Sequence, residues 1–276
     1  MLRTLVSLFF LASTSLGPAM AQPAASVPQL PALKGEYFRL VSNATGRSYH
    51  IHVRLPEGYD AEKAARYPVV YVLDGDALFP VLAASHLFLT IDDKLPEAIL
   101  VGIGYGGFDP AINKRNIDFL PPAAGIAPEA AGAPLFQRLL RNELLPTIDR
   151  RYRTDPARRI IFGQSRSAGF VIWSMLTDPD LFWGGIANNP ALEPALEAVR
   201  GKAAPATRSD LSLIVTNGTE DRPELRRVTQ AWLAERTQRT DDPWALRSVT
   251  IEKGSHSANS PDAYRAGMRI LFGQAR

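Results

Sequence analysis

The sequence predicts an α/β fold with a mostly parallel central sheet, helices on both faces of that sheet, and an antiparallel hairpin at the N-terminal end. Short apolar runs bounded by turn residues alternate with amphipathic stretches of helical period through most of the chain, which is typical of strands joined by crossover helices. The first two strand-like runs instead alternate apolar and polar residues across a short turn, which indicates a hairpin at a sheet edge.

The predicted hairpin pairs residues 36–41 with residues 48–55 around a turn at 43–46. The short apolar runs predicted to be buried strands are residues 69–73, 98–103, 159–162, 185–187, 211–215 and 247–251. The amphipathic stretches predicted to be helices are residues 135–148, 168–176, 223–236 and 262–272, with a further helix after Leu73. Residues 105–134 lack clear periodicity and are rich in Gly, Pro and Ala, so we expect a long loop that faces the substrate.

The composition is that of a globular protein, with 276 residues of which 46% are hydrophobic and 21% charged. A chain of this length buries roughly three quarters of its unfolded surface, which is enough for a core without disulfides or a structural metal. The chain has no cysteine, so thiol nucleophiles, thiolate metal sites and disulfides are excluded. We expect a hydroxyl, amine or carboxylate nucleophile, no metal site and no cofactor.

The charge pattern does not favour nucleic acid as a partner. The formal net charge is +3, and the charged residues are scattered without a block of five like charges. A nucleic-acid surface would need a basic stripe with interleaved aromatic residues. We therefore expect a small-molecule partner.

Residues 1–21 have the pattern of a secretory signal peptide: Arg3, a mostly apolar run at 5–16, and small residues around a cleavage site after Ala21. The alternative is an uncleaved membrane anchor, but the apolar run is shorter than the ~20 residues that a span needs. We expect export to the periplasm or the exterior, with no stable membrane insertion after cleavage. Residues 22–33 are predicted to be a flexible linker, and residues 34–276 a single domain.

The most informative segment is residues 159–169, a buried strand that runs into a turn of small residues and then a helix. A serine on such a turn exposes its hydroxyl above the sheet, and the pattern G-x-S-x-G keeps bulk away from the turn. Here Ser165 is the candidate nucleophile, Gly163 supplies the first small residue, and Ser167 replaces the second glycine. The alternative is an ordinary strand-to-helix turn in which Ser165 caps the helix.

A serine nucleophile needs a base, which is most often a histidine. The chain has four histidines. His256 follows the last predicted strand and precedes the final helix, where a doubly wound sheet would bring it to the serine. His50, His52 and His86 lie in an early strand and an early helix, and we expect them to be packing or surface residues.

An acid should follow the strand at residues 211–215, where Glu220 and Asp221 are the candidates. Both could instead be first-turn acids of the next helix, which would leave a serine–histidine dyad. For the oxyanion hole we expect the backbone N–H groups of Asp76 and Arg166 as donors, because the turn before Asp76 follows an early strand and contains a glycine. A plain Asp-Gly turn is the alternative there.

Several motifs in order resemble the "Putative esterase" family of α/β-hydrolases, and within it the branch of enterochelin esterase-like and siderophore-ester hydrolases. The resemblance covers about residues 36–273. The matching segments are LPEGY at 55–59, YPVVYVLDGD at 67–76, VGIGY at 101–105, Arg115 with DFLP at 118–121, residues 136–152, the turn around Ser165, and DPDLF at 178–182.

The resemblance implies the α/β-hydrolase fold, catalytic roles for Ser165 and His256, and hydrolysis of carboxylic esters, with siderophore trilactones as substrates of the similar branch. It favours Glu220 over Asp221, on the interpretation that Glu220 fills the family's G-x-x-E position. The elbow departs from the family's more frequent GHSLGG. Arg166 beside the nucleophile therefore either meets an anionic acyl group or points to solvent, and Arg115 either contacts substrate or braces the long loop.

The sequence therefore predicts an exported serine esterase that works through an acyl-enzyme. Two alternatives remain open: an acyltransferase of the same fold, and an inactive hydrolase-fold protein that serves as a binding module. The replacement of a glycine by Ser167 is the feature that favours the last alternative.

Overall fold

The structure is a computed structural model that describes residues 33–273. The predicted signal peptide at 1–21 lies outside the described residues, as does the predicted linker at 22–33 except for its last residue. No helix among residues 33–273 combines the length and the apolar character that a membrane crossing requires.

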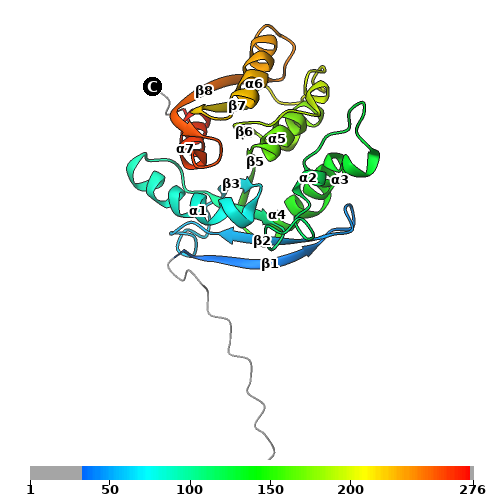
Figure 1. The fold of residues 1–276 in the computed structure, drawn as a ribbon. Coiled ribbons are helices and arrows are strands. Elements are labelled where there is room, and N and C mark those ends of the chain that lie inside the picture. The colour runs from blue at the N-terminus through cyan, green and yellow to red at the C-terminus, as the bar shows by residue number, and fades with distance from the viewer. Residues whose placement is uncertain (1–32, 274–276) are drawn as a thin grey trace, which may run out of the picture. The chain divides into compact units, whose positions relative to one another are not determined.

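Within residues 33–273 an eight-stranded sheet has the order β1-β2-β4-β3-β5-β6-β7-β8 (Figure 1). β1 and β2 form the predicted antiparallel hairpin, β2 is antiparallel to β4, and the remaining neighbours are parallel. The strands are β1 (Gly35–Val41), β2 (Ser48–Arg54), β3 (Tyr67–Val72), β4 (Ile99–Gly104), β5 (Thr154–Gln164), β6 (Gly184–Asn188), β7 (Leu211–Glu220) and β8 (Trp244–Ser255). The predicted mostly parallel sheet with an N-terminal hairpin is confirmed.

Helices cover both faces of the sheet (Figure 1). One face carries α1 (Gly75–Asp92) and α7 (Ser260–Leu271), which contact each other. The other face carries α3 (Ala133–Leu139), α4 (Leu145–Arg151), α5 (Arg166–Thr177) and α6 (Pro223–Arg236). Buried apolar side chains accordingly form two clusters, one on each face.

Strand β3 contributes side chains to both apolar clusters. Val69 and Tyr71 pack into the cluster beneath α5, whereas Val70 and Val72 pack into the cluster beneath α1. All four are fully buried. A strand buried on both faces reads as a continuous apolar run, which explains why these strands show no period-two pattern.

Three local predictions were inaccurate. The predicted helix at 135–148 is interrupted by a π turn at Leu140–Leu144, next to Pro146, which cannot donate a backbone hydrogen bond to the preceding turn. The aperiodic segment at 105–134 contains the short helix α2 (Arg115–Asp118) and a 3-10 turn at Pro128–Ala130. Strands β7 and β8 run well past their predicted ends, and this extension determines which acid reaches the candidate site.

Candidate active site

Ser165 lies on a strained turn between β5 and α5. Its backbone has φ 60° and ψ −118°, a left-handed conformation that a residue with a Cβ rarely adopts. The turn is fixed from both sides, because the Ser165 N–H donates to the Asn188 carbonyl (2.9 Å) and the Ser165 carbonyl accepts from the N–H groups of Gly169 (3.1 Å) and Ala191 (3.0 Å). This geometry lifts the hydroxyl above the carboxyl edge of the sheet.

The small residues around the turn have distinct reasons to be small. A Cβ on Gly163 would lie 2.5 Å from the Ser167 carbonyl oxygen, so glycine is required there. Ser167 is fully buried and its hydroxyl is used: it accepts from the Gln164 N–H (2.8 Å) and donates to Asp74 Oδ2 (2.7 Å). The replacement of the usual second glycine therefore adds hydrogen bonds and leaves the turn intact.

The Ser165 hydroxyl, the His256 imidazole and the Asp221 carboxylate form one hydrogen-bonded chain. Ser165 Oγ lies 3.0 Å from His256 Nε2, and His256 Nδ1 lies 2.6 Å from Asp221 Oδ1. A carboxylate can only accept, so Nδ1 carries the proton and Nε2 is free to accept from the serine. The Asp221 side chain is 1% exposed and that of His256 is 14% exposed. The three residues come from the ends of β5, β7 and β8, which the sheet order brings to one edge.

The structure brings Asp221, and not the favoured Glu220, to the histidine. Glu220 is exposed at the last position of β7, where it pairs in register with Ser255. Asp221 follows it in a turn closed by its own N–H on the Gly218 carbonyl (3.2 Å), which directs its side chain to the histidine. The G-x-x-E spacing of the family also points to Asp221, because Asp221 and not Glu220 is the third residue after Gly218.

Two residues that the sequence analysis missed hold the histidine loop in place. Gln164 Nε2 donates to the His256 carbonyl (2.7 Å), and Asn189 Nδ2 donates to the same oxygen (2.9 Å). Asn189 Oδ1 accepts from the Gly218 N–H (2.8 Å), so one amide joins the ends of β6, β7 and β8. A sequence signal for Asn189 did exist: it follows the predicted strand that became β6, and sites in α/β proteins lie at the carboxyl ends of strands.

The two residues expected to supply oxyanion donors both lie in the first turn of a helix. Arg166 is the first residue of α5 and Asp76 the second of α1, and neither backbone N–H has an acceptor within residues 33–273. The Asp76 carboxylate accepts from the N–H groups of Tyr105 (2.6 Å) and Gly106 (2.9 Å), which fixes the start of α1 against the end of β4.

The Arg115 side chain forms an ion pair with Asp74. Its Nε and a terminal nitrogen lie 2.7 and 2.9 Å from the two carboxylate oxygens. Burial alone would lower the pKa of Arg115, but the hydrogen bonds and charge of Asp74 raise it above the ordinary value. Of the two interpretations of Arg115, this contact favours the brace: it connects α2 to the turn that also holds Ser167.

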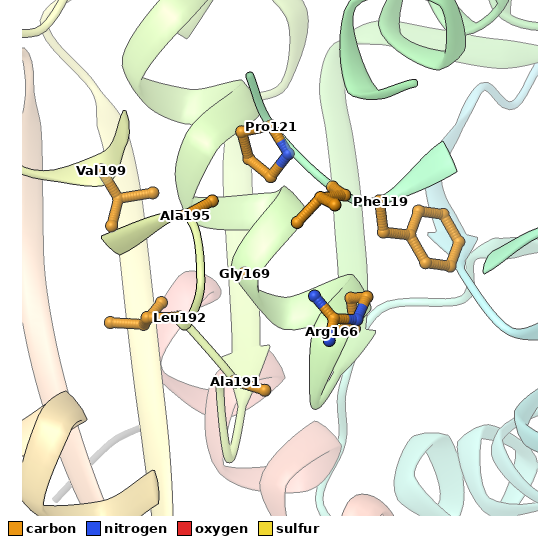
Figure 2. A pocket seen from close by; sticks show the side chains of 9 residues that line it. Phe119, Pro121, Arg166, Gly169, Ala191, Leu192, Ala195 and Val199 are labelled. Atoms are coloured by element: carbon orange, nitrogen blue, oxygen red, sulfur yellow. The ribbon is translucent and has the colours of Figure 1, made fainter. Parts of the chain in front are cut away.

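A small, open cleft lies against the first turn of α5, directly after the nucleophile in sequence (Figure 2). It is lined by Phe119, Leu120, Pro121, Arg166, Gly169, Ala191, Leu192, Ala195 and Val199. Part of the expected substrate-facing segment at 105–134 thus contributes to it. No residue between 33 and 273 forms a hydrogen bond or an ion pair with the Arg166 side chain, and burial together with the positive charge of Arg115 lowers the pKa of Arg166.

Comparison with known proteins agrees with this architecture. The family model described as "Putative esterase" matches residues 42–267. The chain belongs to this family. The BES protein from Bacillus cereus, a solved structure, superposes with a TM-score of 0.75 at 23% identity, covering 92% of this chain and 98% of that one. The fold is that of the α/β-hydrolases.

Two curated relatives are similar to this protein over part of their length. The ferri-bacillibactin esterase BesA of Bacillus subtilis is 33% identical over 177 residues, which are 58% of this chain and 60% of that protein. The siderophore triacetylfusarinine C esterase of Aspergillus fumigatus is 28% identical over 177 residues, 59% of this chain and 58% of that protein. The matched region thus spans about three fifths of each relative.

Proposed function

We propose that this protein is a serine esterase that hydrolyses carboxylic esters through an acyl-enzyme on Ser165. The observation that carries the proposal is the hydrogen-bonded chain from Ser165 Oγ through His256 (3.0 Å) to Asp221 (2.6 Å). These are the three parts that a hydroxyl nucleophile needs: a base within reach, and a carboxylate that orients the base and stabilises its protonated form.

In the first half-reaction Ser165 Oγ attacks the ester carbonyl carbon while His256 Nε2 takes the hydroxyl proton. The negative charge that develops on the carbonyl oxygen is stabilised by the backbone N–H groups of Arg166 and Asp76, which the fold leaves without an acceptor among residues 33–273. When the tetrahedral intermediate collapses, the bond to the alcohol oxygen breaks and His256 gives its proton to that oxygen. The products are a free alcohol and an acyl group on Ser165.

In the second half-reaction a water molecule gives a proton to His256 Nε2 and attacks the acyl carbon. Collapse of this second intermediate breaks the bond to Ser165 Oγ, which recovers its proton from the imidazole, and the carboxylic acid is released. Throughout, Asp221 holds the imidazole in the tautomer with Nδ1 protonated. Gln164 and Asn189 keep the histidine loop in place through its backbone carbonyl.

For the substrate we propose siderophore esters. Membership of the Putative esterase family and the names of two curated relatives support this class, since both relatives are esterases of siderophores. The two names specify different siderophores, so they support the class and not one compound. We further propose that the protein is exported, which rests on the signal-like sequence of residues 1–21.

Turnover of p-nitrophenyl acetate tests the proposed reaction. The wild-type protein should release p-nitrophenol and the variant Ser165→Ala should not. The two should share one melting temperature, because Ser165 is only part-buried and its hydroxyl bonds only the histidine among residues 33–273. Activity retained in the alanine variant would place the nucleophile elsewhere. Glycerol added as an acceptor separates hydrolysis from acyl transfer, because a transferase would form the glycerol ester in place of free acetate.

A further inference from the structure

Arg166 places a positive charge in a cleft that is otherwise without charged side chains. Of the nine residues that line the cleft, the other eight are glycine, alanine, proline, leucine, valine or phenylalanine. Figure 2 shows these side chains around the cleft, with Arg166 projecting from the start of α5. A guanidinium in such surroundings loses part of its hydration, and an anion that enters the cleft would stabilise it through charge-assisted hydrogen bonds.

The carboxylates that adjoin the cleft are occupied by other partners. Asp118, which directly precedes the lining segment 119–121, pairs with Arg47 and is fully buried. Asp74, which bonds the turn beside Arg166, pairs with Arg115. No carboxylate between residues 33 and 273 is therefore within ion-pair distance of Arg166, whose guanidinium keeps its bidentate donor set for a ligand.

The cleft lies on the acyl side of the nucleophile. The leaving alcohol oxygen must be protonated by His256, so the alcohol leaves toward the loop between β8 and α7. None of the nine lining residues comes from that loop; they come from α5 and from the segments around residues 119–121 and 191–199. The N–H of Ala191, a lining residue, bonds the Ser165 backbone carbonyl, so the cleft adjoins the turn that carries the nucleophile.

We propose that the cleft binds an acyl group that ends in a carboxylate, with Arg166 as its counter-ion. The inference rests on the proposed esterase function and narrows the substrates, siderophore esters included, to esters whose acyl group carries a free carboxylate. The acyl chain is short because the cleft is small and open to solvent. The apolar wall contacts the methylene groups, and the guanidinium donates a pair of hydrogen bonds to the terminal carboxylate.

The test compares kcat/KM for two esters that differ in one charge: p-nitrophenyl hydrogen adipate, which is anionic, and p-nitrophenyl methyl adipate, which is neutral. The wild-type protein should favour the anionic ester by at least about tenfold, the effect of one hydrogen bond to a charged group. Arg166→Met should reduce that ratio by at least about tenfold, and Arg166→Lys should restore part of it because the charge remains. Using the ratio within each variant cancels any effect of the substitution on the reaction itself.

The matched control is Arg227→Met, which removes the same charge from an exposed position on α6. Its ratio should equal that of the wild type. A ratio near one in the wild type, or a ratio unchanged by Arg166→Met, would overturn the acyl-carboxylate inference while leaving the esterase proposal in place. Failure of the wild type to cleave either ester, together with failure of Ser165 to react with a fluorophosphonate, would overturn both.

Discussion

Replacement of Asp221 by asparagine, with Glu220→Gln as its matched control, separates the two neighbouring acids of the site. Asp221→Asn keeps the shape of a side chain whose Oδ1 accepts from His256 Nδ1 (2.6 Å) and from the Arg222 N–H (2.6 Å). It removes the negative charge that stabilises the imidazolium formed during proton transfer. Glu220→Gln removes the same charge one residue earlier, from an exposed side chain at the end of β7.

The expected magnitude follows from the burial of the pair. Asp221 is 1% exposed, so water cannot replace its charge, and removal of a triad acid of this kind costs about 10⁴-fold in kcat. The imidazole retains 14% exposure and hence some stabilisation by solvent. We therefore expect a loss of about 10³–10⁴-fold, or about 4–5.5 kcal/mol of transition-state stabilisation. Glu220→Gln should stay within about twofold of wild type, as exposed substitutions usually do.

The assay is the initial rate of p-nitrophenyl acetate hydrolysis under saturating substrate, with the melting temperature of each variant as a check on folding. A large loss in Asp221→Asn alone agrees with the geometry. If Glu220→Gln loses as much as Asp221→Asn, the arrangement of the two acids is wrong. If neither loses more than about tenfold, the serine and histidine work as a dyad, and Asp221 has a structural role only.

Three further outcomes are expected. Ser167→Ala leaves the buried Gln164 N–H without its acceptor and should lower the free energy of unfolding by about 1–3 kcal/mol in urea melts; an unchanged midpoint would contradict the role given to this hydroxyl. Asn189→Ala removes the link between the Gly218 N–H and the His256 carbonyl and should lower kcat/KM by about 5–30-fold, whereas an intact rate in a folded variant would show that the loop needs no such support. Burial, aided by the charge of Arg54, lowers the pKa of His86 to about 3. The unfolded ring therefore takes up a proton as pH falls below about 6.5 while the folded ring does not, so stability is lost in that direction, by about 2 kcal/mol between pH 7 and pH 5; a His86→Phe variant with the same pH dependence as wild type would refute this cause.

The positions of the strands along the chain could be predicted from the sequence because each buried strand is a short apolar run with turn residues at both ends. Val69 and Ile99 pair in neighbouring parallel strands as the alternation of strands and helices implies. The ends of the strands could not be predicted. Strands β7 and β8 continue as a paired ladder up to Glu220 and Ser255, and the mostly polar residues of these extensions give no apolar signal in the sequence.

The predictions for the site differed in the same way. Ser165 and His256 stand next to strong local signals, a small-residue turn and a strand end, and the structure brings them within 3.0 Å. The choice between Glu220 and Asp221 depends on how far β7 continues and where its chain turns, which is decided by pairing with β8, a strand more than twenty residues away in sequence. The contacts of Asn189 likewise join three strand ends, and no local pattern records them.

The brace formed by Arg115 illustrates a further limit of local patterns. The sequence marked Arg115 as important but could not say whether it meets a substrate or another part of the chain. The partner is Asp74, forty-one residues earlier. Its carboxylate accepts hydrogen bonds from both the Arg115 guanidinium and the Ser167 hydroxyl. Only the three-dimensional arrangement unites these groups beneath the nucleophile.

Mass spectrometry of the protein after reaction with a fluorophosphonate ester tests the mechanism most directly, because such a reagent forms a stable bond only with an activated hydroxyl. One adduct per chain, located on Ser165 and absent from His256→Ala, is the expected result. A wild-type protein that hydrolyses esters yet carries the adduct on another residue, or carries none, would contradict the assignment of Ser165 as the nucleophile.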